Sequence, residues 1–466
     1  MKVTWKKTLC MVLAGMFALG AAGCAGGSNV KLEDLYIPVY EDNGQHFRTL
    51  ADTPPNMSDR TQAEMYKAVG FTAVPYTEDY VSASDVAMIG EESSYIKGLK
   101  LCEELGIDAF IRPGSSHTSK TPTDEPNYFE RNFSTIDFRD YPAVKGFYIV
   151  DEPTYGQLLD LEDRYLPWFN ENYGGENFEF FVNLLGCHNA NWRTSEFKDK
   201  TYDDYAEKSI SIIERAQAVN KFHSVDFYTL RVYDSGYDMY EFNLKVHQDA
   251  AARAKNHNMN FTGYVQVFGG NADGSSYRIP STFAEVNWGV YNLLSFGAEQ
   301  LKFFCYRDYK KDNLVGMVTD GQPNERYYFV QEALQTLAKW DHVMLSYKWN
   351  HLYTNVGTGS RSATNPAFEH VRSVVKPITD VEKVRSKYDI TMNEFTDAEG
   401  NKAFMLFNYD DPIMNRKNKT TITFKEAQGV RYYKDGEPVD VVLENGKFEI
   451  ELESGEGVFV IPLYKK

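Results

Sequence analysis

The sequence predicts a (β/α)8 barrel of the TIM type followed by an antiparallel β-sandwich, and three observations lead to this fold class. Short apolar strands alternate with helical stretches through residues 35–348, which is the order of a parallel barrel. These strands are continuously apolar, as strands covered on both faces are. Residues 349–466 contain short alternating strands separated by turns such as Asp435-Gly436, which are typical of a sandwich.

Eight expected strands carry the barrel pattern, and most are followed by an amphipathic helix. In chain order the strands are residues 35–40, 71–76, 107–111, 146–150, 178–185, 222–228, 262–268 and 300–306. The helices are expected over residues 59–69, 93–105, 156–170, 205–219, 242–256, 282–296 and 325–345. A doubly wound open sheet is the competing fold, but the chain has no glycine-rich phosphate motif of the GxGxxG or GxxxxGK[ST] type.

The N-terminus has the pattern of a targeting segment. Lys2, Lys6 and Lys7 precede an apolar run that ends in Ala21-Ala22-Gly23-Cys24. This ending resembles the lipobox of bacterial lipoproteins, which implies cleavage before Cys24 and a lipid on its sulfur. Residues 1–24 would then be the signal peptide and residues 25–34 a tether, and the protein would lie at the cell surface or on the periplasmic face. An ordinary secretory signal is the alternative.

Composition limits the partners. The formal net charge of −17 argues against nucleic acids and anionic membrane surfaces, which would repel the chain. Aromatic residues make up 15% of the chain, which suits either a sugar ligand or an aromatic-rich core. Neither the histidines nor Cys102, Cys187 and Cys305 show the spacing of a metal site, and no cofactor is expected.

The ends of the expected strands supply the candidate site, because a TIM barrel carries its chemistry at this edge. The residues there are Glu41, Asp42, Glu78, Asp79, Arg112, Asp151, Glu152, Asn183, Asp226, Tyr228, Gln266, Tyr306, Arg307 and Asp308. Carboxylates dominate, and glycosidic cleavage requires two of them with different pKa values. Glu152 is the expected general acid, because the apolar strand before it would desolvate its carboxyl group and raise its pKa.

Three stretches carry a resemblance to a known family: Gly146 to Pro153, Val225 to Tyr228, and residues 278–306. They resemble the TIM-barrel glycoside hydrolases of the large retaining clan that includes β-galactosidases and endoglucanases. The chain departs from that clan at two positions: Asp151 stands where the clan has Asn, and Gln266 stands where it has the nucleophilic Glu. A glutamine cannot attack an anomeric carbon, so another carboxylate is needed. Asp226 is the expected second carboxylate, with Glu285 and Asp308 as alternatives.

The sequence therefore predicts a lipid-anchored, extracytoplasmic glycoside hydrolase in which Glu152 and Asp226 cleave O-glycosidic bonds. The expected substrate-binding residues are Asp151, Arg112, Asn183, Tyr228, Gln266 and Tyr306. Glu285 also has a purely structural explanation, because an acid at a helix start stabilises the helix. The alternative function is a non-catalytic carbohydrate-binding lipoprotein. A glutamine in place of the nucleophile at position 266 would be expected in such a protein.

Overall fold

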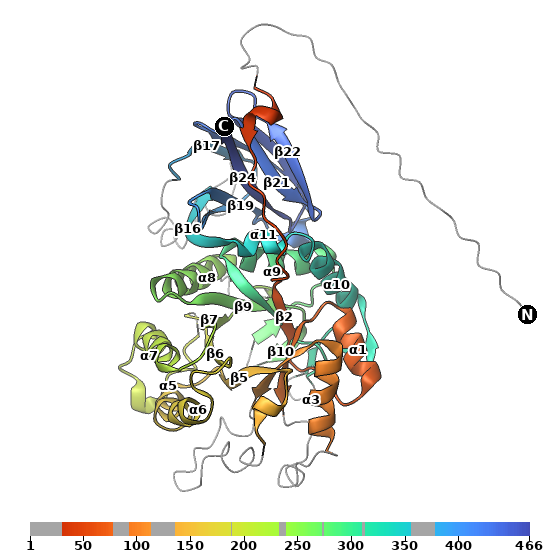
Figure 1. Cartoon of the computed structure of the whole chain (residues 1–466), viewed down its shortest axis with the longest axis vertical. Coiled ribbons are helices and arrows are strands. Elements are labelled where there is room, and N and C mark those ends of the chain that lie inside the picture. Colours follow the sequence, from red (N-terminus) through yellow and green to blue (C-terminus); the bar gives the residue numbers. More distant parts are fainter. Residues whose placement is uncertain are drawn as a thin grey trace, which may run out of the picture.

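The computed structural model describes residues 30–77, 93–112, 136–187, 189–232, 239–272, 275–309, 313–355 and 378–466. A barrel lies in the lower half of Figure 1, and antiparallel sheets lie in the upper half. Cys24, Glu78 and Asp79 lie outside the described residues. No helix in the described part of the chain is long and apolar enough to cross a membrane.

Eight parallel strands form the barrel, in the order β2-β12-β9-β7-β6-β5-β4-β3. Their bounds are β2 (Arg48–Ala51), β3 (Ala73–Thr77), β4 (Asp108–Arg112), β5 (Val144–Asp151), β6 (Glu179–Leu185), β7 (Phe222–Asp226), β9 (Asn260–Gln266) and β12 (Ala298–Phe304). The two end strands of this order meet, because the amide of Thr72 donates a hydrogen bond of 3.0 Å to the carbonyl of Thr49. The sheet is therefore a nearly closed barrel, as the sequence predicts.

Helices cover the outside of the barrel, and several begin at a side chain that caps the first turn. Thr154, Thr201 and Thr282 each accept a hydrogen bond at a helix start. The helices are α1 (Arg60–Ala68), α3 (Ser94–Leu105), α5 (Tyr155–Asp160), a π-helical turn (Leu161–Tyr165), α6 (Leu166–Tyr173), α7 (Tyr202–Arg215), α8 (Met239–Asn256), α9 (Phe283–Ser295), α10 (Glu325–Leu337) and α11 (Asp341–Leu345). Short 3-10 turns lie at Leu32–Asp34, Phe138–Asp140, Ser195–Phe197 and Pro412–Met414.

The inside of the barrel is filled by side chains rather than open. One buried apolar cluster there consists of Leu50, Ala73, Phe110, Tyr148, Phe181 and Phe222. Arg48 bonds both carboxyl oxygens of Glu179, at 2.9 and 2.7 Å, where β2 and β6 begin. This ion pair lies at the amino ends of the strands, so polar groups at their carboxyl ends lie at the opposite end of the barrel.

The prediction for the first strand was wrong. Residues Leu35–Tyr36 form β1, which pairs antiparallel with β24 of the C-terminal sheet, with Tyr36 opposite Tyr464. The first barrel strand is instead β2, whose Arg48-Thr49-Leu50-Ala51 sequence is too short and too polar to read as a buried strand. Glu41 and Asp42 are exposed and do not follow a barrel strand.

Two antiparallel sheets form the C-terminal part and share a buried apolar core. The larger sheet contains β1 and the strands β16 (Tyr347–Asn355), β18 (Ile390–Asp397), β19 (Lys402–Asn408), β21 (Gly429–Lys434), β22 (Glu437–Val442) and β24 (Gly457–Lys465). The smaller sheet contains β17 (Val381–Ser386), β20 (Asn418–Phe424) and β23 (Lys447–Leu452). The predicted sandwich is thus present as two packed antiparallel sheets.

Short strands after the barrel strands form small antiparallel sheets. One consists of β8 (Arg231–Val232), β10 (Gly269–Ala272), β11 (Ser275–Tyr277) and β13 (Leu314–Val315), and the other of β14 (Val318–Thr319) and β15 (Gln322–Pro323). Because β8, β10 and β13 follow β7, β9 and β12, the first small sheet lies over one side of the barrel mouth.

Candidate active site

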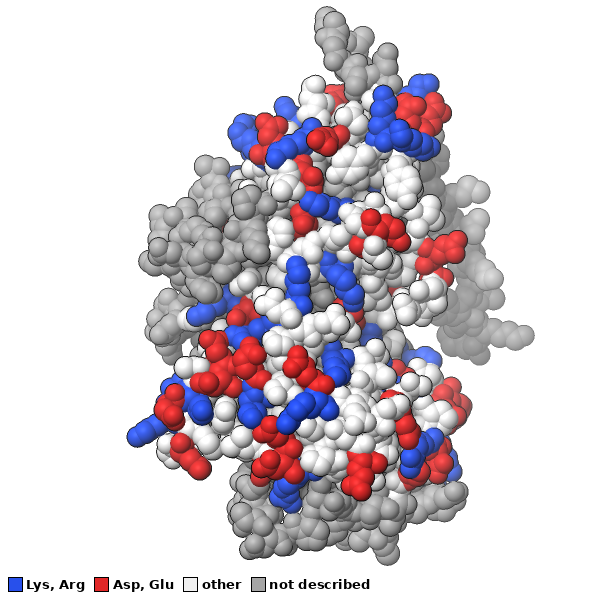
Figure 2. All heavy atoms as spheres, turned by 60° about the vertical axis from the view of Figure 1, so that its left-hand side comes forward, with Lys and Arg blue, Asp and Glu red and all other residues white. Residues whose placement is uncertain are grey.

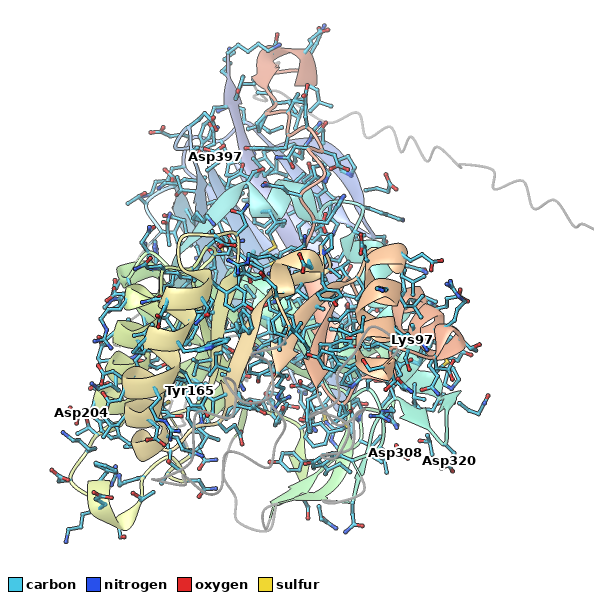
Figure 3. All side chains as sticks on the ribbon, turned by 60° about the horizontal axis from the view of Figure 1, so that its bottom comes forward. Lys97, Tyr165, Asp204, Asp308, Asp320 and Asp397 are labelled. Atoms are coloured by element: carbon cyan, nitrogen blue, oxygen red, sulfur yellow. The ribbon has the colours of Figure 1, made fainter. Side chains whose placement is uncertain are left out.

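The carboxyl ends of the barrel strands form the barrel mouth, which comes forward in Figure 3. Arg112 and Asp151 are the last residues of β4 and β5, and Asp226 is the last residue of β7. Asn183 lies in β6, two residues before its end, and Asp52 directly follows β2. The structure thus brings these four predicted site residues, among others, to one end of the barrel and adds Asp52.

Arg112 links two carboxylates in this mouth. Its guanidinium donates to Asp52 Oδ1 at 3.0 Å and to Asp151 Oδ2 at 2.7 Å, and it also lies 4.6 Å from the ring centre of Tyr148. Asp151 Oδ1 accepts hydrogen bonds from the Tyr148 hydroxyl at 2.7 Å and from Asn183 Nδ2 at 2.9 Å. The guanidinium and these hydrogen bonds outweigh the effect of burial and keep the pKa of Asp151 below its ordinary value.

Asp52 has the opposite shift. Burial raises the pKa of Asp52 above its ordinary value, although Arg112 and the Tyr264 hydroxyl, at 2.5 Å from Oδ2, both favour the carboxylate. The Tyr264 hydroxyl also lies 3.0 Å from that of Tyr148. One hydrogen-bonded network therefore joins the ends of β2, β4 and β5 to the interior of β9.

Lys302 lies one layer below this network and is fully buried. Its ammonium donates to Asn183 Oδ1 at 3.0 Å and to Ser224 Oγ at 2.5 Å, and Ser224 in turn donates to Asn183 Oδ1 at 2.5 Å. Two donors to Asn183 Oδ1 fix the amide orientation, so that Nδ2 faces Asp151. Burial lowers the pKa of Lys302 to about 7, against the attraction of Asp52, Asp226 and Asp151.

Asp226 is the most perturbed carboxyl group of the mouth. It is 8% exposed, and its Oδ1 has no hydrogen-bond partner among the described residues. Burial, followed by the nearby Asp151 carboxylate, raises the pKa of Asp226 to about 7, while the Tyr228 hydroxyl and Lys302 act in the opposite direction. A buried carboxyl group with a pKa near 7 can hold a proton at neutral pH and donate it.

Glu152 has a different environment from the one that the sequence suggested. The residue is exposed, so the expected desolvation of its carboxyl group does not occur. Its backbone has a φ of 47°, a left-handed conformation that costs a non-glycine residue about 1–2 kcal/mol.

Hydrogen bonds on both sides hold this conformation. The Glu152 amide donates to the Asn183 carbonyl at 2.9 Å, and the Tyr205 hydroxyl donates to the carbonyl of Pro153 at 2.7 Å. The Tyr155 amide donates to the Trp192 carbonyl at 2.8 Å. The structure therefore holds an exposed carboxylate at the mouth in a conformation that glycine or asparagine would adopt more easily.

Gln266 ends β9, at the position where the clan that the sequence resembles has its nucleophilic Glu. Its side-chain amide donates to the carbonyls of Leu230, Phe268 and Arg278 at 2.9, 3.2 and 3.1 Å. Its Oε1 accepts from the Leu230 amide at 2.9 Å. The side chain fastens the segments that lead into β8 and follow β11, so its hydrogen-bonding capacity is used within the protein.

Replacing Gln266 by glutamate is expected to destabilise the protein by at least about 3 kcal/mol at neutral pH. A carboxylate has no hydrogen to donate and would face three carbonyl oxygens in a buried position. Urea denaturation of Gln266→Glu measures the loss, with Gln322→Glu at an exposed position of β15 as the control. A stable Gln266→Glu variant with increased glycosidase activity would show instead that the position is ready to hold a nucleophile.

The remaining candidates lie outside the network. Glu285 is the third residue of α9, and its Oε2 accepts from the backbone and hydroxyl groups of Ser281 and Thr282, while Oε1 pairs with Arg278. Asp308 Oδ1 accepts from the Gly316 amide at 2.9 Å and the Thr319 hydroxyl at 3.1 Å. Both carboxylates hold local structure in place, as expected for Glu285.

The two tyrosines expected to bind substrate differ in position. Tyr228 is 9% exposed and packs at the mouth against Phe268, with ring centres 4.8 Å apart. Tyr306 is fully buried and packs against Tyr66 and Phe71, at 5.0 and 6.3 Å between ring centres. The structure does not bring Tyr306 to the mouth.

The sequence analysis did not name several residues of the network, among them Asp52, Tyr264 and Lys302. Asp52 follows an apolar pair and precedes Pro54, the same signal that identified the acids before Pro153. Lys302 interrupts the apolar strand β12, and a charge inside a buried strand indicates a partnered, functional position. In the described part of the chain no cluster of three or more His, Cys, Asp or Glu side chains could hold a metal ion.

Comparisons with known proteins concern the fold alone. No family model matches the chain, and no curated protein sequence matches it. Solved structures do match. One described as "Glycoside hydrolase" is 11% identical with a TM-score of 0.53, over 90% of this chain and 92% of the other. This likeness, at such low identity, shows the fold alone, and it confirms the predicted barrel with appended antiparallel sheets.

Two further matches are weaker. A GH42 β-galactosidase from G. stearothermophilus is 8% identical with a TM-score of 0.49, over 92% of this chain and 99% of the other. A family 30 subfamily 8 xylanase from Clostridium acetobutylicum is 10% identical with a TM-score of 0.46, over 90% and 96%. Like the first match, both are described as glycoside hydrolases or by such an activity.

Proposed function

We propose that the protein is a glycoside hydrolase that cleaves O-glycosidic bonds at the barrel mouth with Asp226 and Glu152. The observation that carries the proposal is Asp226 itself, which is buried, has an unpartnered Oδ1 among the described residues, and has a pKa near 7. A structural carboxylate would be expected to have its hydrogen bonds satisfied. A carboxyl group that must release and recover a proton needs this environment.

The two carboxylates take opposite roles to those expected from the sequence. Asp226, which burial keeps protonated, donates its proton to the leaving glycosidic oxygen as the bond to the anomeric carbon breaks. Glu152, exposed and held by its backbone, accepts a proton from the water whose oxygen forms the new bond to that carbon. Arg112 and Asn183 hold Asp151 between them, where its carboxylate keeps the pKa of Asp226 high.

The positions of the two strands favour inversion at the anomeric carbon. β5 and β7 are separated by β6, so their backbones lie about 10 Å apart at the usual strand spacing. Carboxyl groups about 6.5–9.5 Å apart leave room for a water, whereas about 5–5.5 Å is needed for a covalent intermediate. The arrangement thus suits direct attack by water.

The N-terminal sequence supports an anchored, extracytoplasmic protein. The lipobox-like ending at Cys24 would place a lipid on the mature N-terminus. We propose that the protein acts at the cell surface or on the periplasmic face. Labelling of cells with a radioactive fatty acid tests this, because replacing Cys24 by Ser should abolish incorporation if the cysteine carries the lipid.

Hydrolysis of a glycan panel followed by proton NMR tests the activity. We expect release of reducing sugar with the anomeric configuration inverted in the first product formed. Asp226→Asn should abolish release, and Glu332→Gln, an exposed carboxylate on α10, should leave it unchanged. Retention of configuration would contradict the assigned water attack, and full activity of Asp226→Asn would contradict the assigned acid.

A non-catalytic carbohydrate-binding protein is the second candidate function. Gln266 favours this second function. Its side chain bonds backbone groups at the position where the clan that the sequence resembles has its nucleophilic Glu. Binding of glycans by wild-type protein without cleavage of any, measured on the same panel, would select this function over hydrolysis.

A further inference from the structure

Two tyrosine hydroxyls connect the two carboxyl groups that Arg112 holds at the barrel mouth. Asp52 Oδ2 lies 2.5 Å from the Tyr264 hydroxyl, which lies 3.0 Å from the Tyr148 hydroxyl. The Tyr148 hydroxyl lies 2.7 Å from Asp151 Oδ1. We call these four side chains the tyrosine bridge. Asp52 and both tyrosines are buried, whereas Asp151 is half-buried, so the bridge joins a buried carboxyl group to the mouth.

The number of protons in the tyrosine bridge follows from its contacts. If both carboxyl groups are ionised, the Tyr264 hydroxyl donates to Asp52 and the Tyr148 hydroxyl donates to Asp151. Each hydroxyl has only one hydrogen, so the contact of 3.0 Å between the two hydroxyl oxygens would then contain no proton. Buried polar groups are normally hydrogen-bonded. One further proton, on a carboxyl group, makes all three contacts hydrogen bonds.

Asp52 is the carboxyl group that holds this proton at rest. Burial raises the pKa of Asp52, whereas Arg112 and two hydrogen bonds keep the pKa of Asp151 low against the effect of burial. In Figure 2 acidic and basic side chains lie beside one another at the surface, where water screens their charges. Asp52 is 2% exposed and lacks this screening. The proton on Asp52 then donates to Tyr264, and Tyr264 donates to Tyr148.

Arg112 allows this proton to move. Its guanidinium contacts Asp52 at 3.0 Å and Asp151 at 2.7 Å, so it is paired with a carboxylate whichever of the two is ionised. Transfer of one proton along each hydrogen bond leaves Asp52 ionised and Asp151 neutral. Each tyrosine oxygen gains one proton and loses one, so the charge of the bridge does not change.

The position of the negative charge matters for Asp226. Asp151 raises the pKa of Asp226 more strongly than Asp52 does, so a charge moved to Asp52 repels the Asp226 carboxylate less. We propose that the tyrosine bridge holds one proton and passes it from Asp52 to Asp151 as Asp226 releases its own proton. The role in catalysis rests on the proposed function of Asp226 as the acid. Asp52 and the two tyrosines are positioning residues, because they act through Asp151.

An NMR titration of the carbon-labelled Asp226 carboxyl group in Asp52→Asn tests the proposal, with Asp226→Asn identifying the signal. Asparagine can accept from Arg112 and donate to Tyr264, as protonated Asp52 does, but it cannot release the proton. We expect the pKa of Asp226 to rise by about half a pH unit or more, because the charge can no longer leave Asp151. Tyr228 and Lys302, which also act on Asp226, are unchanged in this variant.

The sign of the shift decides the outcome. If Asp52 were an ordinary carboxylate, its removal would lower the pKa of Asp226, and if Asp52 kept its proton throughout, the pKa would not change. Either result would overturn the proposal.

A second variant interrupts the tyrosine bridge at its centre. Tyr264→Phe removes the hydroxyl between Asp52 and Tyr148, so the pKa of Asp226 should again rise, and a fall or no change would contradict the relay. Tyr328→Phe, at an exposed tyrosine of α10, is the matched control and should titrate like wild type. These titrations need no substrate, so they decide the role of the bridge whether or not the protein cleaves a glycan.

Discussion

Replacing Glu152 by glutamine is expected to lower kcat on a cleaved glycan by about 10²- to 10⁴-fold, the usual contribution of a general base. The amide has nearly the same shape as the carboxylate but cannot accept a proton from water. The Glu152 amide and the Pro153 carbonyl form hydrogen bonds through backbone groups, so these two bonds remain in the variant. KM should therefore change little, and steady-state kinetics with circular dichroism measure both effects.

Replacing Glu152 by glycine separates catalysis from stability at the same position. Glycine adopts a φ of 47° without the steric cost that glutamate pays. We expect Glu152→Gly to be as inactive as Glu152→Gln and to unfold at a urea concentration equal to or above that of wild type. If Glu152→Gly retained activity, or if both variants lost stability by several kcal/mol, the residue would have a structural role instead.

The strained backbone of Glu152 is consistent with a functional residue, because such conformations are concentrated at functional sites. Asp151 and Glu152 illustrate the difference. They are adjacent in the sequence, yet Asp151 enters the Arg112 network while Glu152 is exposed. The alternation of side chains along a strand predicts that only one of two neighbouring acids can face the same partners.

The barrel could be predicted because most of its strands are continuous apolar runs that can be recognised in the sequence. Phe147 to Val150 and Phe180 to Val182 are apolar runs of the kind that a covered parallel sheet accommodates, and both lie in strands. β2 has no such mark, since Arg48 begins it and reaches Glu179 at the floor of the barrel. Its assignment depends on a contact 131 residues away in the chain, which no local pattern contains.

The site could be predicted only in outline. Strand ends correctly indicated the positions of Arg112, Asp151, Asn183 and Asp226, because the fold brings those ends together. The burial of the acidic side chains could not be predicted. Glu152 was expected to be desolvated and is exposed, whereas Asp226 is the buried acid. The use of Gln266 by the segments around Leu230 and Arg278 depends on loop conformations, which the sequence does not specify.

The rate of hydrolysis should begin to fall near pH 7 as the pH is raised. We call this part of the pH profile the alkaline limb. Asp226 must carry a proton to act as the acid, and its pKa of about 7 means that the active form predominates below pH 7. Above that value the rate should fall about tenfold per pH unit. Measuring kcat between pH 5 and 9 tests this, and a rate that is constant to pH 9 would exclude Asp226 as the acid.

Lys302 sets the position of this alkaline limb. The groups that act on Asp226 are the carboxylates of Asp151 and Asp52, the Tyr228 hydroxyl and the Lys302 ammonium, and of these only Lys302 supplies positive charge. Replacing Lys302 by methionine, which matches the length of the buried side chain, removes that charge. The carboxylate form of Asp226 becomes less favourable wherever Lys302 is protonated. Because the pKa of Lys302 is itself about 7, the pKa of Asp226 and the alkaline limb should rise by up to about one pH unit.

The direction of this shift distinguishes electrostatic control from damage to the fold. A general loss of structure would lower kcat at every pH, whereas loss of the Lys302 charge moves the limb upward and leaves the variant relatively more active at alkaline pH. Ser224 still donates to Asn183 Oδ1 in the variant, so the amide orientation is kept. A limb that stays near pH 7 in Lys302→Met would mean that the ammonium does not control the proton on Asp226.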